Sequence, residues 1–116
     1  MGHCRIFSIS YDRSLLATRE LMLRQTGCEV VGALGYDDAI DKAAADHFDL
    51  IIMGHSIPQK DKRAIVAAIR QRGCQAPVIS LLRYGEHSIP EAARAIDPDP
   101  KHLLATVKEM LGSGPC

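Results

Sequence analysis

Polar side chains with possible chemical roles follow the short apolar runs of the chain. Ser10, Tyr11 and Asp12 come directly after one run, and His55 and Ser56 come shortly after another. A histidine can act as a base, carry a phosphoryl group or bind a metal, and a serine can act as a nucleophile. These positions therefore raise the questions of phosphotransfer and of hydrolysis.

For His55, the alternative to a chemical role is a polar loop residue whose ring hydrogen-bonds to the backbone. We favour that alternative, because no acidic partner lies near His55 in the sequence. The segment Gly54-His55-Ser56-Ile57-Pro58 is also similar to the nucleophile elbow of hydrolases, but Pro58 stands where that motif needs a second glycine. Ser56 is therefore expected to be a turn residue or a helix cap.

The sequence predicts no cofactor. A metal site needs ligands at a typical spacing, whereas His55, His87 and the cysteines are scattered. The chain has no glycine-rich phosphate loop, which argues against a flavin or a nucleotide. The carboxylates of Asp12, Asp37 and Asp99 are expected to cap helices, and Asp12 could also face a pocket beside Ser10.

The composition fits one compact soluble domain, with 116 residues, 47% hydrophobic and 24% charged. Fourteen basic residues balance fourteen acidic ones, so no net charge favours nucleic acid, an acidic substrate or a membrane surface. No apolar run approaches the roughly 20 residues of a membrane span, and the first ten residues lack the apolar core of a signal peptide. We therefore expect a cytoplasmic location with all cysteines reduced, namely Cys4, Cys28, Cys74 and Cys116.

Apolar runs rich in β-branched residues alternate along the chain with helical patterns. Such alternation predicts parallel strands joined by right-handed crossovers. Five strands over this length predict an α/β flavodoxin-like three-layer sandwich with the sheet order 2-1-3-4-5, in which ligands bind beyond the carboxyl ends of the strands. The expected strands are residues 6–9, 29–34, 49–53, 77–82 and 93–96. Four helices are expected: one after Asp12, one after Asp37, one over residues 59–72 and one that begins at Asp99-Pro100.

Glycines are expected to end three of these helices, at Gly27, Gly73 and Gly112. The residues after the last helix, 112–116, are expected to form a flexible tail.

The segment from Asp49 to Pro58 has the sequence DLIIMGHSIP. It resembles the receiver domain of two-component response regulators, the CheY-like family. In that family an Asp-Leu-hydrophobic run leads to the phosphorylated aspartate and, four residues later, to a proline. Similar stretches are Ala76-Pro77-Val78-Ile79 and Asp99-Pro100 with Leu103-Leu104, so the resemblance covers about residues 4–111, the expected domain.

The resemblance assigns chemical roles to positions where this sequence has other residues. The phosphorylated aspartate would stand at Gly54, and the acidic pair that holds Mg²⁺ would stand at Ser10 and Tyr11. The Thr or Ser that contacts the phosphoryl group corresponds to Leu82, and the lysine that neutralises its charge corresponds to Asp97. An anion cannot replace a cation beside a transferring phosphoryl group, so we expect neither phosphoryl acceptance nor autophosphatase activity.

The segment between Leu82 and Asp97 is short and contains Pro90. The family's fourth helix is therefore expected to be shortened or missing, with one turn left near Pro90. In receivers that helix helps to form the output and dimer surface.

The sequence thus predicts a non-catalytic pseudo-receiver that acts by protein–protein interaction. Its expected partner is another signalling protein, such as a histidine kinase or an output protein, or a second copy of itself. The expected surfaces are residues 10–12, 54–58 and 83–90 and the last helix. Two alternatives stay open: a phosphorelay receiver with relocated chemistry at His55 or Asp12, and a small hydrolase that uses Ser56.

Overall fold

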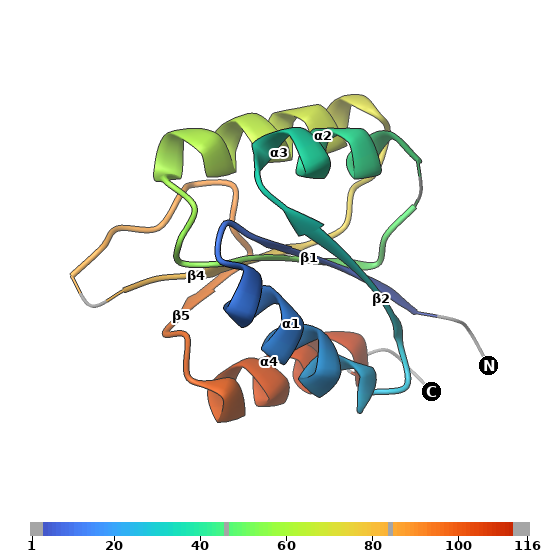
Figure 1. The fold of residues 1–116 in the computed structure, drawn as a ribbon, viewed down its shortest axis with the longest axis vertical. Coiled ribbons are helices and arrows are strands. Elements are labelled where there is room, and N and C mark those ends of the chain that lie inside the picture. Colours follow the sequence, from blue (N-terminus) through green and yellow to red (C-terminus); the bar gives the residue numbers. More distant parts are fainter. Residues whose placement is uncertain (1–3, 46, 84, 113–116) are drawn as a thin grey trace.

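Five parallel strands form one sheet in the order β2-β1-β3-β4-β5, flanked by four helices (Figure 1). The computed structural model describes residues 4–45, 47–83 and 85–112. The elements in chain order are β1 (Arg5–Ser10), α1 (Arg13–Arg24), β2 (Glu29–Leu34), α2 (Tyr36–Ala45), β3 (Leu50–Met53), α3 (Gln59–Gln71), β4 (Val78–Leu81), β5 (Arg94–Ile96) and α4 (Pro100–Gly112). The predicted flavodoxin-like, CheY-like sandwich and its strand order are confirmed.

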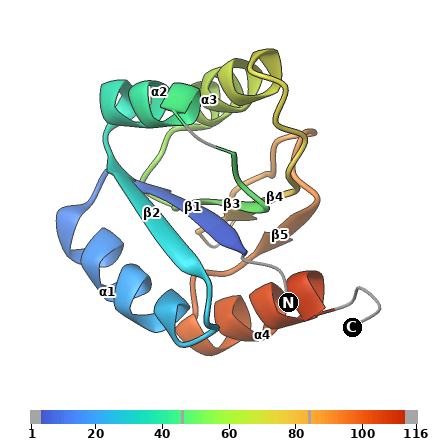
Figure 2. The same ribbon diagram turned by 90° about the vertical axis from the view of Figure 1, so that its right-hand side faces the viewer.

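Helices cover both faces of the sheet, so that the molecule has three layers (Figures 1 and 2). α1 and α4 lie on one face, and α2 and α3 lie on the other. Successive strand residues point to opposite faces: Ile6 packs in the core with Leu23 of α1 and Leu103 of α4, whereas Phe7 packs in the core with Ile65 of α3. The continuous apolar run of β3 is explained by this double coverage.

Two of the three expected caps are confirmed. The Asp12 carboxylate accepts a hydrogen bond from the Leu15 N–H at 3.0 Å, and the Asp99 carboxylate accepts one from the Lys101 N–H at 2.8 Å. The expectation for Asp37 is wrong, because α2 already begins at Tyr36 and Asp37 lies within its first turn.

Between β4 and β5 the chain forms no helix, as judged over residues 82–83 and 85–93. The turn near Pro90 is present, because the Ala92 N–H donates to the Ile89 carbonyl at 3.2 Å, and the Glu86 N–H donates to the Arg83 carbonyl at 3.1 Å in an earlier turn. Gln59 and Arg63 of α3 hold this segment, through the His87 carbonyl and the Glu91 carboxylate respectively. The expected loss of the fourth helix is therefore confirmed.

The carboxyl-terminal helix runs one residue further than expected. Gly112 is its last residue and does not belong to a tail, and residues 113–116 lie outside the described part of the chain. Among the described residues, no helix is both long and apolar enough to cross a membrane.

At the amino edge of the sheet, Cys4 and Cys28 form a disulfide, with their Cα atoms 4.8 Å apart. The expectation of reduced cysteines is wrong for this pair. The cause is register: Arg5 of β1 lies opposite Glu29 of β2, so the residues just before these two strands face each other although they are 24 positions apart. Cys74 is free and buried, and Cys116 lies outside the described residues.

Candidate functional site

The ends of β1 and β3 meet at the carboxyl edge of the sheet, where the Gly54 N–H donates to the Ile9 carbonyl at 2.9 Å. Ser56 connects the two segments, because its hydroxyl accepts from the Tyr11 N–H at 3.0 Å and lies 3.3 Å from the Ser10 hydroxyl. Ser56 is thus the turn residue expected from the sequence. The loop after β1 and the loop after β3 are fixed to each other.

Tyr11 reaches across to α3 and donates its phenol hydrogen to the Asp61 carboxylate at 2.8 Å. Desolvation raises the pKa of Tyr11 first, and the hydrogen bond to Asp61 raises it further. The phenol therefore stays protonated and serves as a donor. This bond anchors the β1 loop to α3.

Arg19 of α1 occupies the space beside Gly54. A Cβ atom on Gly54 would lie 2.7 Å from Arg19 Nη1 and 3.2 Å from the Ile9 carbonyl oxygen. Arg19 is only 5% exposed. Any side chain at position 54 would therefore compete with a buried guanidinium group for the same space.

The guanidinium of Arg19 has few partners for a buried cation. Its Nη2 lies 3.2 Å from His55 Nδ1, whereas its Nη1 is buried without a hydrogen-bond partner among the described residues. Burial lowers the pKa of Arg19, and the charge of Asp12 opposes that shift. The site thus holds a positive charge, and most N–H donors of this guanidinium have no hydrogen-bond acceptor among the described residues.

His55 lies in the turn after β3, but its partner is the side chain of Arg19 rather than the backbone. Burial lowers the pKa of His55, and the charges of Arg19 and Arg83 lower it further. Since arginine can only donate, Nδ1 must be the acceptor, and the proton of the neutral ring is assigned to Nε2.

A second buried cation approaches from the other face of the sheet. Lys62 of α3 is 1% exposed, and its Nζ donates to the Ser80 hydroxyl and to the Leu81 carbonyl, each at 2.9 Å. Burial lowers the pKa of Lys62, and the charge of Glu86 opposes this. The carboxyl edge therefore receives one cation from each helical layer.

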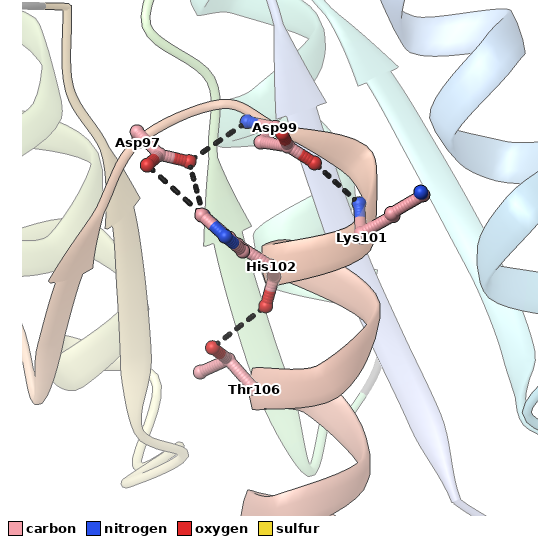
Figure 3. A network of polar contacts seen from close by, with 5 residues as sticks. All are labelled: Asp97, Asp99, Lys101, His102 and Thr106. Carbon is pink, nitrogen blue, oxygen red and sulfur yellow. Dashed lines mark hydrogen bonds and ion pairs between the residues drawn. The ribbon is translucent and has the colours of Figure 1, made fainter.

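Leu82 and Asp97 stand apart from this constellation. Leu82 is half-buried just after β4, and its N–H donates to the Ile96 carbonyl at 2.9 Å. Asp97 is exposed and turns toward α4, where its carboxylate lies 2.9 Å from His102 Nδ1 and accepts from the Asp99 N–H at 3.0 Å (Figure 3). Asp97 thus serves the start of α4.

The geometry of the fold matches solved proteins closely, although their sequences are distant. A two-component response regulator from Clostridium difficile superposes with a TM-score of 0.80 at 20% identity, covering 95% of this chain and 97% of that one. A CheY-like receiver domain protein from Methanospirillum hungatei JF-1 gives 0.78 at 21% identity, over 97% and 96% of the two chains. The chemotaxis response regulator CheY4 of Vibrio cholerae gives 0.76 at 21% identity, over 94% and 99%. The chain has the receiver fold.

No sequence-family model and no curated protein sequence matches the chain. The relation to receivers is therefore one of fold, and the chemistry of the site has to be argued from its own residues.

The resemblance to receivers implies Mg²⁺ at this edge, and the residues present do not fit that ion. Mg²⁺ prefers carboxylate oxygens, whereas this edge offers the hydroxyls of Ser10 and Tyr11 beside the cations Arg19 and Lys62. The nearby carboxylate of Asp12 accepts the capping hydrogen bond of α1. Within the described ranges, no three His, Cys, Asp or Glu residues gather closely enough to hold a metal.

Neither Arg19 nor Lys62 is among the site residues expected from the sequence, yet a signal for both exists. Arg19 lies four positions after Leu15 and four before Leu23, in the middle of the apolar stripe of α1. Lys62 stands in the same way before Ile65, Val66 and Ile69 on α3, all of which are buried. A charged residue in the apolar stripe of a helix must reach a polar site or remain buried at a cost.

Proposed function

We propose that residues 4–111 form a pseudo-receiver, a signalling module that works by protein–protein interaction without aspartyl phosphorylation. The observation that supports this most is the position of Arg19 Nη1, 2.7 Å from the place of a Cβ atom on Gly54. The resemblance puts the phosphorylated aspartate at that position. Here the position has no side chain, and a cation fills the space.

The electrostatics of the site point the same way. Phosphoryl transfer to an aspartate needs Mg²⁺ to neutralise the charge between two anions. Arg19 lies beside Gly54, and Lys62 is a second buried cation at the same edge of the sheet, so both would repel that ion. A receiver without both the acceptor and the metal can still present its surface to a partner.

The two alternatives have less support. His55 Nδ1 accepts a hydrogen bond from Arg19, and Asp12 Oδ1 caps α1, so each candidate for relocated phosphoryl chemistry already has a structural contact. For a hydrolase, Ser56 would need a base, but its hydroxyl contacts the Tyr11 N–H and the Ser10 hydroxyl. No hydrogen bond joins Ser56 to His55 in the described part of the chain.

We propose the surface around the carboxyl edge and α4 as the contact region, with a histidine kinase, an output protein or a second copy of the chain as partner. We also propose a cytoplasmic location, although the Cys4–Cys28 disulfide is a rare feature in that compartment. Fractionation of native cells tests this: the protein should be recovered with cytoplasmic markers, and recovery with markers of an oxidising compartment would refute the location.

The phosphorylation claim is tested by amide NMR of the full chain. Mg²⁺ with beryllofluoride, and separately Mg²⁺ with acetyl phosphate, should give no saturable shifts at Gly54, His55 or Leu82. A phosphorylatable receiver domain treated in parallel confirms that the reagents work. Saturable shifts centred on Gly54 in this chain would refute the proposal.

A variant separates the loss of the acceptor from the loss of its surroundings. Gly54→Asp restores a carboxylate but leaves Arg19 and the missing acidic pair unchanged, so intact-mass measurement after acetyl phosphate treatment should show no phosphorylated species. Phosphorylation of Gly54→Asp would mean that the pocket still binds Mg²⁺. For the alternative at His55, phosphate incorporation from a kinase that is lost in His55→Ala would replace the proposal.

A further inference from the structure

A pocket of 280 Å³ lies between α1 and α4, beside the loop that follows β5. Its lining is mostly apolar, with Leu15 and Met22 from α1, Leu103 from α4, and Pro98 and Pro100 at the start of α4. Small-molecule sites commonly measure about 300–1,000 Å³ and combine apolar walls with a few polar groups. This pocket has the composition of such a site and is slightly smaller than that range.

Among the described residues that line this pocket, Arg19 is the one with a permanent charge. A guanidinium carries five N–H donors, and within residues 4–45, 47–83 and 85–112 a single one of them has an acceptor, His55 Nδ1. Arg19 Nη1 is buried, and none of the described residues offers it a hydrogen-bond partner. Buried donors without acceptors are rare in folded proteins, and such a donor is usually met by a water, an ion or a ligand.

His55 is the other ionisable residue that lines the pocket. Because its Nδ1 faces Arg19, its Nε2 carries the proton and can donate to a ligand. The low pKa of His55, caused first by burial, keeps the ring in this neutral donor form. The two ionisable side chains of the pocket thus offer donors, and the hydroxyl of Thr18, which also lines it, can donate or accept.

We propose that the pocket between α1 and α4 binds a small organic anion, a carboxylate with an apolar body. The carboxylate would take the free donors of Arg19 and His55, and the apolar body would lie against Leu15, Met22 and Leu103. Planar carboxylates pair with guanidinium groups through two parallel hydrogen bonds. The charge of the ligand would complement a cation that the protein itself leaves unmatched.

Other ligand classes fit less well. A cation would be repelled by the charge of Arg19. An apolar neutral molecule would leave the buried donors without hydrogen-bond acceptors. Inorganic phosphate would satisfy the donors but would leave the apolar walls uncovered, and burying those walls is favourable by about 25 cal/mol for each Å². This inference goes beyond the proposed function and does not depend on it, since a pseudo-receiver could act with or without a bound ligand.

Octanoate is the probe for the first test, followed by amide NMR of the full chain. Saturable shifts should appear at Leu15, Met22 and Leu103 and extend to His55. Octan-1-ol has the same apolar chain without the charge, and it should bind about tenfold or more weakly. Inorganic phosphate should give no saturable shift at Leu103.

Three variants locate the site. Arg19→Met should weaken octanoate binding about tenfold or more, because the charged donors are lost. Met22→Trp keeps Arg19 and fills the pocket from α1, so it should abolish binding even if Arg19→Met folds poorly. Leu21→Ala, at a position that is 68% exposed on the same helix, should bind octanoate as the unchanged protein does.

Several outcomes would overturn the proposal. Equal binding of octanoate and octan-1-ol would show that the pocket binds apolar chains without selecting for charge. Binding of phosphate as tight as that of octanoate would show that the site binds anions without using its apolar walls. Octanoate affinity unchanged in Met22→Trp would place the ligand elsewhere. Binding of an acidic amphipathic helical peptide, with no response to octanoate, would assign the groove to a protein partner.

Discussion

The two edges of the sheet differ in how completely their arginines are paired. At the amino edge, the Arg5 side chain pairs with Glu29 at 3.0 Å, the Asp49 carboxylate accepts from the Arg5 N–H at 2.8 Å, and Cys4–Cys28 joins two strands covalently. At the carboxyl edge, Arg19 is buried with a donor that has no acceptor.

The difference separates stability from function. Paired groups and cross-links stabilise a fold, whereas a buried donor without an acceptor costs about 1–3 kcal/mol. Ligands of open α/β sheets bind outside the carboxyl ends of the strands. We infer that the amino edge holds the fold together, and that the carboxyl edge keeps an unfavourable arrangement for the sake of binding.

The largest expected effect comes from breaking the amino edge. Removing the disulfide in Cys4→Ser/Cys28→Ser should lower the free energy of unfolding by about 3 kcal/mol, because the cross-link closes a loop of moderate length. For a domain of this size the midpoint temperature should fall by roughly 10 °C. Thermal unfolding followed by circular dichroism measures this.

Dithiothreitol supplies the control for that experiment. It should lower the midpoint of the unchanged protein to nearly that of the double variant, and should leave the double variant where it is. If reduction leaves the unchanged protein as stable as before, the amino edge does not carry the stability that we assign to it.

At the carboxyl edge a mutation should have the opposite sign. Arg19→Met removes a buried charge and its unmatched donor while keeping most of the side-chain volume, so it should raise the free energy of unfolding by about 1–2 kcal/mol. Chemical denaturation measures the change. Arg94→Met is the matched control, because Arg94 is an exposed arginine paired with Glu109, and exposed ion pairs contribute little to stability. A clear loss of stability in Arg19→Met would contradict the comparison of the two edges.

A smaller effect tests the close contact between Gly54 and Arg19. Gly54→Ala should cost about 1 kcal/mol, since the new Cβ would press on the buried guanidinium and on the Ile9 carbonyl. The loss should shrink when Arg19 is also changed to Ala, giving a coupling energy of about 0.5–1 kcal/mol.

Gly32→Ala is the control for this pair of variants. Its Cβ would lie 2.9 Å from a carboxylate oxygen of Glu20, but that side chain is partly exposed and can move away. Gly32→Ala should therefore cost less than Gly54→Ala. Purely additive effects at positions 54 and 19 would show that the contact is not tight.

Much of this architecture could be predicted from the sequence, because alternating apolar runs and caps are local signals. β2 was expected at 29–34 and lies there, and Asp12 and Asp99 cap their helices as expected. The disulfide could not be predicted, since it depends on the register between two strands rather than on cysteine spacing.

For the site, the sequence predicts which side chains are missing but not which groups take their place. Gly54, at the end of β3, marks a missing side chain in the sequence itself, but the group that fills its space comes from α1. Arg19 and Lys62 do interrupt the apolar stripes of their helices. Their meeting at one edge, however, follows from the packing of two helices on opposite faces of the sheet, which no local pattern contains.

The smallest expected effect compares two histidines of the same chain. The hydrogen bond and the charge of Asp97 raise the pKa of His102 above its usual 6.5, whereas burial and the charge of Arg19 lower that of His55. NMR titration of the ring protons should therefore place His102 above 6.5 and His55 below it. The groups that face His55 are Arg19, Arg83, Lys62 and Glu86, three of which are cations.

The two shifts give opposite pH dependences of stability. The contribution of His102 is complete below about pH 6.5 and is lost as the pH rises through its raised pKa, because the folded state holds the proton more tightly. The contribution of His55 is present above about pH 6.5 and is lost as the pH falls through its lowered pKa, because the folded state resists protonation. Asp97→Asn should bring the midpoint of His102 down toward 6.5, and Arg19→Met should raise that of His55. If both histidines titrate together in the unchanged protein, then His55 does not lie beside a buried cation. The contrast between a paired arginine at the amino edge and an incompletely paired one at the carboxyl edge would then fail at the candidate ligand site.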